Sequence, residues 1–384
     1  MNYRTRIVPS LSEIGQAAWD GLLQAQADGN PFLSFAFLHA LHESGSASSK
    51  TGWQPQFLTL WRGDWLEAAL PLYVKSHSYG EYVFDWAWAD AYQRNGLDYY
   101  PKLLSAIPFT PVTGSRLLAR DAPAQTALIN AMRTLQVGND VSSAHVLYAP
   151  EAQAQALRDA GFMLRTGVQF HWLNPGYQNF EEFLATLEQK KRKNIRAERR
   201  KVSDAGVTFR HVTGEQATEA DWRFFKRCYD HTYAEHYSTP YLNLDFFLRI
   251  GTAMPQHVLL VVAEQDGKPV ASSLLIHDRH TLYGRYWGAV RHVPCLHFET
   301  AYYQPIEFCI AQGIRCFEGG AQGEHKMARG FLPQKTWSAH WLAHPAFADA
   351  IERFLRQEKD GIDSYIGELN DRNPFKAAQA GFQS

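Results

Sequence analysis

The sequence has few cysteines and no surplus of charge of either sign. Only four of its 384 residues are Cys, and none of them forms a C-x-x-C pair. We therefore expect free thiols in a reducing compartment. The formal net charge is −1, which excludes a basic field over the whole surface that would attract nucleic acid or membrane. Any such attraction must come from a local patch.

Long apolar runs and the best-known catalytic motifs are also missing. No run of 18 apolar residues exists, so no segment is expected to span a bilayer. The start, MNYRTRIVPSLSEIGQ, lacks the apolar core of a signal peptide, and a cytoplasmic protein is expected. There is no G-x-S-x-G elbow, no Walker loop, no strand-linked G-x-G-x-x-G and no H-E-x-x-H. A metal cofactor is not expected.

Two distant stretches have the same pattern, which predicts two β-hairpins. Gln56–Val74 and Val258–His277 each contain an apolar strand, a turn with Gly and Asp, and a second strand. Aromatic segments follow at Glu81–Trp86 and Tyr283–Gly288, and both are predicted to be strands. The two glycines of the second strand suggest a bulge or the close approach of another backbone or of a ligand. With flanking helices, this order indicates an α/β fold (α+β, with a mixed sheet).

Tyrosine pairs extend the match between the two halves. Tyr99-Tyr100 and Tyr302-Tyr303 are separated by nearly the same offset as the hairpins, and each pair is placed in a helix. The constant offset favours an internal duplication. The breaker cluster Asn174-Pro175-Gly176 then predicts a first domain over residues 1–173 and a second over 174–384. The second carries the main site, and the tail, residues 345–384, packs on the first.

The second half contains the densest group of reactive side chains. A predicted helix, His297–Gly313, starts with Glu299 at the edge of an apolar stripe, either as an acid–base group or paired with Arg285 or Arg291. The next segment, Phe317–Pro333, follows a short strand with three glycines in seven residues. Glycines permit close backbone approach to a ligand. Polar residues lie among and after them: Glu318, Gln322, Glu324, His325, Lys326 and Arg329.

Two further segments suggest binding. A long helix is predicted from Phe180 to about Val202, and its part Gln189–Lys201 carries eight cations and one acid. Such a run is typical of a solvated helix but also suits a phosphate-rich partner. Lys193, Arg196 and Arg200 are the candidate donor-binding residues on it. In the first half, Phe84–Tyr92 combines Asp85 and Asp90 with aromatic residues, and could line a substrate pocket or serve structure alone.

At this point the chain resembles a known group of enzymes. The order of hairpin, aromatic strand, loop, helix and strand is similar to the core of the GNAT acyltransferase superfamily, and its tandem form resembles the FemAB-like branch. Asn30–Ala47, Phe84–Gly114 and the segments HFETAYYQPIE and FEGGAQGEHKMARGFLP resemble a bacterial FemAB-like family labelled as predicted N-acyltransferases. The resemblance implies tandem GNAT-like acyl-CoA N-acyltransferase domains.

The resemblance also implies transfer of an acyl or aminoacyl group to an amine of a small molecule or peptide, such as a peptidoglycan-related precursor. The amine must lose a proton, for which Glu299, Glu318 and His325 are the catalytic candidates. We expect these three side chains to converge on one cavity. The residues assigned to substrate binding are Asp85, Tyr100, Lys102, Arg285, Tyr286, Trp287, Tyr303, Gln322, Lys326 and Arg329.

One loop departs from the GNAT pattern. Most GNAT enzymes bind the coenzyme A pyrophosphate on a glycine-containing loop, whereas Arg291–His297 contains no glycine and Pro294 removes an amide. The expected donor is therefore an acyl-CoA or an aminoacyl-tRNA, and transfer RNA is a candidate partner for the basic helix. A non-catalytic GNAT-like module that binds RNA or a cell-wall precursor remains the alternative.

Overall fold

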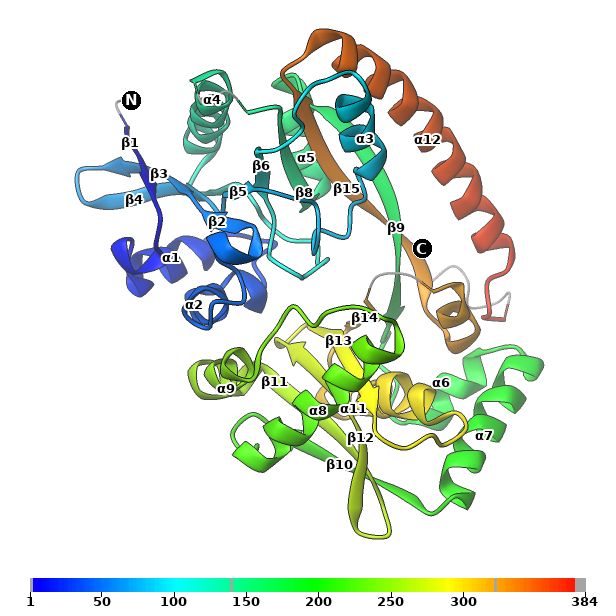
Figure 1. Cartoon of the computed structure of the whole chain (residues 1–384). Helices are drawn as coiled ribbons and strands as arrows, with labels where there is room; N and C mark the ends of the chain where they lie inside the picture. The colour runs from blue at the N-terminus through cyan, green and yellow to red at the C-terminus, as the bar shows by residue number, and fades with distance from the viewer. Residues whose placement is uncertain (1–2, 139–140, 321–322, 377–384) are drawn as a thin grey trace. The chain divides into compact units, whose positions relative to one another are not determined.

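A computed structural model describes residues 3–138, 141–320 and 323–376. The chain forms two compact units. Unit 1 comprises Met1–Gly167 and Lys335–Ser364, and unit 2 comprises Val168–Gln334 and Tyr365–Ser384. Figure 1 labels their helices and strands along the chain. Each unit has its own apolar core.

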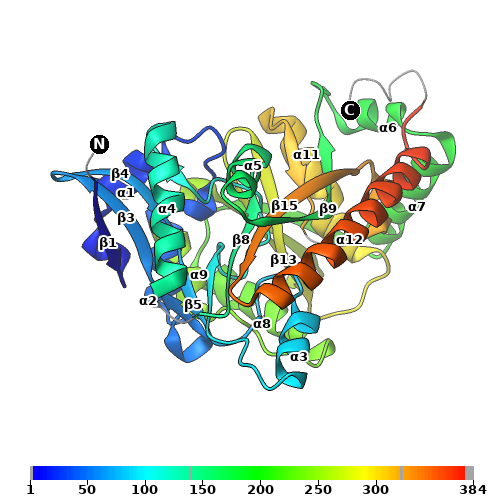
Figure 2. The same cartoon turned by 90° about the horizontal axis from the view of Figure 1, so that it is seen from above.

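Unit 1 begins with a small antiparallel sheet. Its strand order is β1-β3-β4-β7, with β1 at Arg4–Val8, β3 at Phe57–Arg62, β4 at Trp65–Leu70 and β7 at Leu118–Ala119. The turn between β3 and β4 is the predicted Gly63-Asp64, and Gly63 has a φ of 58°, which glycine adopts without strain. The first predicted hairpin is confirmed. Three helices accompany this sheet in Figure 2: α1 (Gln16–Leu23), α2 (Phe35–Glu43) and α4 (Ala122–Gly138).

A second group of strands in unit 1 carries its polar centre. The order β2-β5-β6-β8-β15 joins four short strands to the long β15 (Leu332–Leu342). The four are β2 (Trp53–Pro55), β5 (Tyr73–Lys75), β6 (Lys102–Ser105) and β8 (Ser143–Ala149). β6 and β8 are parallel, and the other pairs are antiparallel. The helices here are α3 (Trp86–Arg94), α5 (Glu151–Asp159) and α12 (Pro345–Asp371).

Unit 2 contains one mixed sheet. Its order is β10-β11-β12-β13-β14-β9, and only the β13–β14 pair is parallel. The strands are β10 (Val207–Thr213), β11 (Val258–Gln265), β12 (Lys268–His277), β13 (Thr281–Ala289), β14 (Cys316–Glu318) and β9 (Met163–Leu173). The second predicted hairpin, β11–β12, is confirmed with its Asp266-Gly267 turn. The helices are α6 (Phe180–Thr186), α7 (Gln189–Asp204), α8 (Glu219–Glu235), α9 (Leu244–Ala253), α10 (Leu296–Phe298) and α11 (Gln304–Gln312).

The two units exchange strands relative to chain order. β9 follows α5 of unit 1 in the sequence, yet its last residues pair with β14 of unit 2. β15 follows the glycine-rich loop of unit 2, yet its later residues pair with β8 of unit 1. The start of the tail also belongs to unit 1, because Ile351 and Leu355 of α12 pack against Trp88 and Tyr92. The domain division at residues 173 and 174 stays a prediction.

Three local predictions were wrong. Glu81–Trp86 is an irregular segment that leads into α3, because Glu81 and Asp85 point inward to a buried lysine. Tyr99-Tyr100 precedes β6 and is not helical, since Pro101 disfavours a helical conformation at Tyr100. The expected long helix from Phe180 is divided into α6 and α7 at Leu187 and Glu188, which both have extended ψ angles.

Candidate functional site

Strands β13 and β14 of unit 2 lie side by side only briefly. They pair over three residues, up to Tyr283 and Glu318, where β14 ends while β13 continues to Ala289. At this point β13 has a bulge, because Leu274 faces Tyr286 and Leu275 faces Gly284, which leaves Arg285 as an extra residue. The expected irregularity of this glycine-containing strand is confirmed. A Cβ at Gly288 would lie 2.0 Å from the Cys228 carbonyl oxygen, so α8 approaches too closely for any larger residue.

Glu318 lies at this parting of the strands. Its Oε2 is 3.9 Å from Nε2 of His171 on β9. Burial raises the pKa of Glu318 to about 8, although the nearby Arg285 opposes the shift. Burial and the nearby Lys326 lower the pKa of His171 to about 4. The pair is therefore not an ion pair at neutral pH but a neutral imidazole beside a carboxyl group that titrates close to neutrality. The sequence analysis did not identify His171.

Lys326 is the buried cation of the glycine-rich loop. Its side chain is almost fully buried, and its Nζ donates a hydrogen bond to the Gly320 carbonyl at 2.8 Å. Burial lowers its pKa to about 8. Its charge also depresses the pKa values of His171, His297 and His325, so each of these histidines lies near Lys326. Gln322, predicted in the same loop, lies outside the described residues.

Arg329 and Tyr303 are tied to the basic helix α7. The Arg329 Nη2 donates to both oxygens of Glu198 at 2.8 and 2.9 Å, and the Tyr303 hydroxyl donates to the same carboxylate. Arg329 also donates to the His325 carbonyl and lies 3.4 Å from the Phe298 ring centroid. Glu198, the one acid within Gln189–Lys201, thus anchors α7 to the glycine-rich loop.

Glu299 is buried and faces α7. The Arg199 Nε donates to both Glu299 oxygens at 3.1 Å, and Gln304 donates at 2.9 Å. Glu299 thus forms an ion pair, as one of its two predicted roles required, but its partner is Arg199 and not Arg285 or Arg291. Burial raises the pKa of Glu299, while Arg199 acts in the opposite direction. The structure gives Glu299 different neighbours from those of Glu318 and His325.

A shallow hollow brings Glu299 together with two of the predicted donor-binding residues. It has a volume of about 450 Å³ and is lined by side chains that include Phe180, Arg196, Arg199, Arg200, Glu299 and Gln304. Arg196 pairs with Glu181 on the surface, at 2.5 Å. Lys193 and Arg200 are exposed on α7. The cations of α7 that face solvent thus form a local positive patch.

The remaining predicted residues of unit 2 line the neighbourhood of β13. Tyr286 packs edge-on against Tyr229, with ring centroids 5.0 Å apart, and Arg285 lies over the Tyr286 ring. Trp287 packs against His297, with ring centroids 4.6 Å apart. His325 is exposed and lies 3.3 Å from the Tyr302 hydroxyl.

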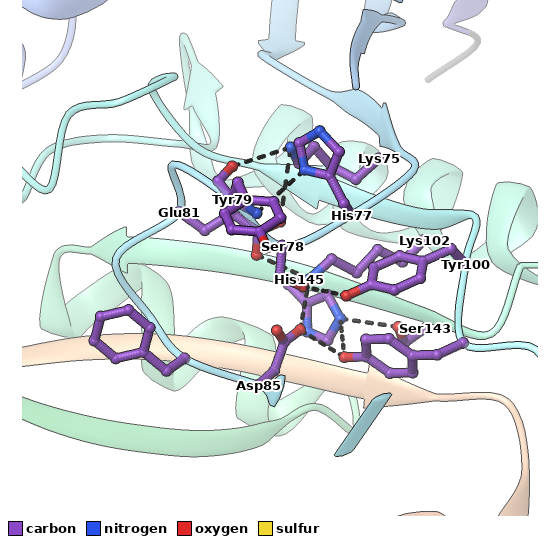
Figure 3. A network of polar contacts seen from close by, with 12 residues as sticks. Lys75, His77, Ser78, Tyr79, Glu81, Asp85, Tyr100, Lys102, Ser143 and His145 are labelled. Atoms are coloured by element: carbon purple, nitrogen blue, oxygen red, sulfur yellow. Dashed lines mark hydrogen bonds and ion pairs between the residues drawn. The ribbon is translucent and has the colours of Figure 1, made fainter. Parts of the chain in front are cut away.

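Unit 1 holds a second polar centre, whose members Lys102, Glu81 and Asp85 are buried. Figure 3 shows its hydrogen bonds. The Lys102 ammonium on β6 donates to Ser78 at 2.7 Å, to Glu81 at 2.8 Å and to Asp85 at 2.5 Å. All three N–H groups of Lys102 therefore have acceptors within the protein. The Ser78 hydroxyl also lies 2.9 Å from that of Tyr100. The predicted residues Asp85, Tyr100 and Lys102 are thus brought together.

The network continues through Tyr99 and two histidines. The Tyr99 hydroxyl donates to Asp85 at 2.7 Å and lies 3.2 Å from Nε2 of His145. The Nδ1 atoms of His145 and His340 are 2.8 Å apart, so one ring donates and the other accepts. Burial lowers the pKa of His145 to about 3, and both rings are neutral. Sequence reasoning missed Glu81 and His145, although Glu81 and Asp85 bracket the segment that Lys102 holds.

Two groups of this centre titrate near neutrality. Burial raises the pKa of Glu81 to about 7 against the opposing charge of Lys102. Burial lowers the pKa of Lys75 to about 7, and its Nζ lies 3.9 Å from Glu81 and 3.8 Å from the Trp53 ring centroid. Among the described residues, Oε1 of Glu81 and Oδ1 of Asp85 accept no hydrogen bond. The centre thus combines two lysines with two carboxylates out of contact with water.

Neither a metal site nor a membrane span is found in the part of the chain that the structure describes. No three His, Cys, Asp or Glu side chains there gather as metal ligands. No described helix combines the length and the apolar character needed to cross a bilayer.

Solved structures with the same architecture identify the fold. FemX matches at 11% identity with a TM-score of 0.57, over 91% of this chain and 100% of FemX. The C-terminal domain of a putative lysylphosphatidylglycerol synthetase from Agrobacterium fabrum matches at 12% identity with a TM-score of 0.54, over 90% and 97%. L-PGS from Bacillus licheniformis matches at 11% identity with the same TM-score and coverage. The chain shares its α/β fold with these three structures, and the mixed sheet predicted from its sequence is present.

A family profile then places the chain more closely. The FemAB-like family, described as acting in peptidoglycan biosynthesis or recognition, matches residues 10–377. The chain belongs to this FemAB-like family, as the sequence resemblance indicated. A search of curated proteins found no match.

Proposed function

We propose that the protein is an N-acyltransferase that moves an acyl or aminoacyl group to an amine of a peptidoglycan-related or other cell-envelope precursor. The observation that carries the proposal is the position of Glu318. It lies where β13 and β14 part, its pKa is raised to about 8 by burial, and the neutral His171 lies beside it. A carboxylate in such a place can accept a proton close to neutral pH.

The proposed reaction begins with attack by the amine nitrogen on the carbonyl carbon of the donor. A C–N bond forms, and the C–O bond of an aminoacyl ester or the C–S bond of a thioester breaks. Glu318 takes the proton that the nitrogen loses and returns one to the leaving oxygen or sulfur. The buried ammonium of Lys326 and the amides of the bulged β13 are suited to stabilise the oxyanion that develops.

The donor that the surface favours is an aminoacyl-tRNA. Lys193, Arg196 and Arg200 lie on the solvent side of α7, and a run of cations attracts a phosphate backbone. The loop that would hold a coenzyme A pyrophosphate has Pro294 and a left-handed Cys295, with a φ of 67°, where a GNAT loop has glycines. Coenzyme A is the second donor to be tested.

In unit 1, the buried centre around Lys102 has a structural role in this proposal and does not contact the reacting atoms. Lys102 uses all its N–H groups to hold Ser78, Glu81 and Asp85. The same segment exposes Phe84 and Trp86. We infer that Asp85 and Lys102 contribute to binding of the acceptor indirectly, by fixing this segment. The Tyr100 hydroxyl is linked to the segment by its hydrogen bond with Ser78.

The test is a transfer assay with the whole chain. Purified protein is incubated with charged tRNA or with acyl-CoA, and with an amine-bearing cell-wall precursor, and Glu318→Gln is compared with the wild type. Loss of a general base lowers the rate by about 10²–10⁴. Glu324→Gln is the matched control, because Glu324 is an exposed carboxylate in the adjoining loop.

Equal turnover by Glu318→Gln and wild type would remove Glu318 from the chemistry. Binding of RNA or of the precursor with no transfer from either donor would favour the alternative, a GNAT-like binding module. The wild-type protein alone decides between transfer and binding without transfer, and only the role of Glu318 requires the variant.

A further inference from the structure

Five ring side chains of unit 2 form a cluster beside Lys326. They come from β13, from the helix that follows it, and from the glycine-rich loop. The ring cluster comprises Trp287, His297, Phe298, Tyr302 and His325. Neighbouring centroids are separated by 4.6 Å for Trp287 and His297 and by 5.4 Å for His297 and Tyr302.

A π-helical turn produces this arrangement. Residues Glu299–Tyr303 form one such turn between α10 and α11. In an α-helix, residues five positions apart do not face each other, yet here the rings of His297 and Tyr302 make contact. A π turn brings such residues together because its period is longer, and π turns concentrate at functional sites. The preceding Cys295 is a non-glycine residue in the left-handed region, with a φ of 67°. This backbone strain also requires a reason.

The ring cluster is half open to solvent, unlike a core. Trp287, His297 and Phe298 are partly buried, and His325 is exposed. Burial lowers the pKa of His297 to about 4, so its ring is neutral, with one donor nitrogen and one acceptor nitrogen. The Arg329 guanidinium covers Phe298 from the protein side, at 3.4 Å from the ring centroid. Flat aromatic faces with neutral donors and acceptors suit a heteroaromatic base.

The position of the ring cluster relates it to the reaction centre. Lys326 lowers the pKa of His297 and His325 as well as that of His171. His171 in turn contacts Glu318. A donor held on the ring cluster would therefore lie beside the proposed base and the buried ammonium. Both donor classes considered above, an aminoacyl-tRNA and an acyl-CoA, carry an adenosine.

We propose that the ring cluster of Trp287, His297, Phe298, Tyr302 and His325 binds the adenine of the donor by stacking and by hydrogen bonds from the two imidazoles. The inference rests on the proposed transfer function and specifies what holds its donor. Adenine provides a π face for Trp287 and His297, together with ring nitrogens and an exocyclic amine that pair with neutral histidine.

Binding of small adenosine probes to the full chain tests the proposal. The probes are coenzyme A, adenosine 3′,5′-bisphosphate and a short RNA ending in CCA, with the same RNA ending in CCC as the base control. Calorimetry or fluorescence anisotropy gives each Kd. A stacked base contributes about 1–3 kcal/mol, so Trp287→Ala and His297→Ala should each weaken adenosine binding by about 5- to 150-fold.

Matched controls separate lost stacking from lost folding. Trp65→Ala removes a tryptophan that is 73% exposed in unit 1 and should leave every Kd unchanged. Trp287→Phe keeps a ring and should restore most of the binding. Tighter binding of coenzyme A and the bisphosphate identifies a coenzyme donor, and tighter binding of the CCA end over the CCC end identifies RNA.

Two results overturn the proposal. One is that neither coenzyme A nor the bisphosphate binds, and that the RNA ending in CCA binds no more tightly than the RNA ending in CCC. The other is that Trp287→Ala and His297→Ala bind as the wild type does. Glu318→Gln keeps the two ideas apart, because it should lower the transfer rate by about 10²–10⁴ and leave adenosine binding intact. Full turnover of Glu318→Gln with normal adenosine binding would reject the proposed base and leave the adenine site standing.

Discussion

His171 and Glu318 are cross-strand partners on β9 and β14, and their side chains approach to 3.9 Å. The pairing places a neutral imidazole against a carboxyl group whose pKa burial raises to about 8. Because directly opposite residues of two paired strands point to the same face, both side chains lie on the same side of the sheet. This relationship makes the ionisation of Glu318, rather than that of a histidine, the first quantity to measure.

The pH dependence of transfer should follow the carboxyl group of Glu318. A base acts when deprotonated, so the rate should rise with pH toward the pKa of about 8. Above that pH the rate should fall again, because Lys326, whose pKa is also about 8, loses the proton of its ammonium. His171→Ala admits water beside the carboxyl group, which reduces the burial effect and should move the rising limb to lower pH. Initial rates between pH 5.5 and 9.5 provide the check. A rising limb that Glu318→Gln retains would assign it to another group.

Lys102→Met should destabilise the protein strongly. The substitution leaves Glu81 and Asp85 buried without their shared cation, and a buried charge without its partner costs about 3–5 kcal/mol. Urea unfolding followed by tryptophan fluorescence measures the loss. Lys50→Met, at an exposed position of the same unit, should change the free energy of unfolding by less than about 0.5 kcal/mol.

The triple variant Lys102→Met, Glu81→Gln, Asp85→Asn extends this test. It replaces the charges by neutral groups and should recover part of the stability that Lys102→Met loses. A Lys102→Met variant as stable as the control would show that water reaches the centre and that the network does not hold the segment before α3.

Glu81 should make stability fall as the pH rises. Its folded pKa of about 7 lies above the unfolded value of about 4.5, so between these values the folded state holds a proton that the unfolded state has lost. The free energy of unfolding should therefore decrease across this window, by up to about 3 kcal/mol. Glu81→Gln should make this slope shallower by the share of Glu81, because Glu318, whose pKa is also raised by burial, keeps its own share. The exposed Glu13→Gln should retain the full slope. Urea titrations at pH 4.5, 5.5 and 7 measure it.

Charge reversal on α7 should weaken binding of a polyanionic donor. Lys193, Arg196 and Arg200 changed together to Glu remove cations on the solvent side of the helix. The slope of log affinity against log salt concentration should fall by about 2–3, close to one unit for each lost phosphate contact. The control reverses Arg353, Arg356 and Lys359, three exposed cations on α12. Equal salt slopes in both triple variants would show that α7 is only a solvated helix.

Arg199 is left out of that test for a physical reason. It belongs to the same run of cations, yet it faces inward to Glu299 and Glu307. Changing Arg199 to Glu would place a new carboxylate beside those of Glu299 and Glu307, in a largely buried position. The variant would then measure a loss of folding stability and not a loss of binding.

The sequence predicted the parts of the fold that depend on local pattern. Both hairpins formed where Gly63-Asp64 and Asp266-Gly267 stand, because turn chemistry acts within four residues. The irregularity of β13 followed from the glycines in Tyr283–Gly288. The aromatic segment Glu81–Trp86, in contrast, indicated a strand, and the structure is irregular there. Its two acids point at Lys102, which lies on a strand later in the chain.

The candidate site was less accessible to sequence reasoning. Glu318 and Lys326 were identified from composition alone, since polar residues in a glycine-rich loop are unusual. His171 was missed because its partner lies on a distant strand, and no spacing rule relates the two. The same holds for Arg199 and Glu299, whose pairing depends on how α7 packs against the π-helical turn. Contacts between distant segments require the fold itself.

The exchange of β9 and β15 has a consequence for biosynthesis. Residues 1–167 emerge from the ribosome before Lys335–Leu342 is synthesised. β8 therefore remains an unpaired sheet edge while the intervening residues of unit 2 are translated. An unpaired edge is a site of misassociation, and such a delay lengthens its exposure. His145 therefore meets His340 only near the end of synthesis. The nascent chain of this protein would need protection at β8, and truncation before residue 342 would expose that edge permanently.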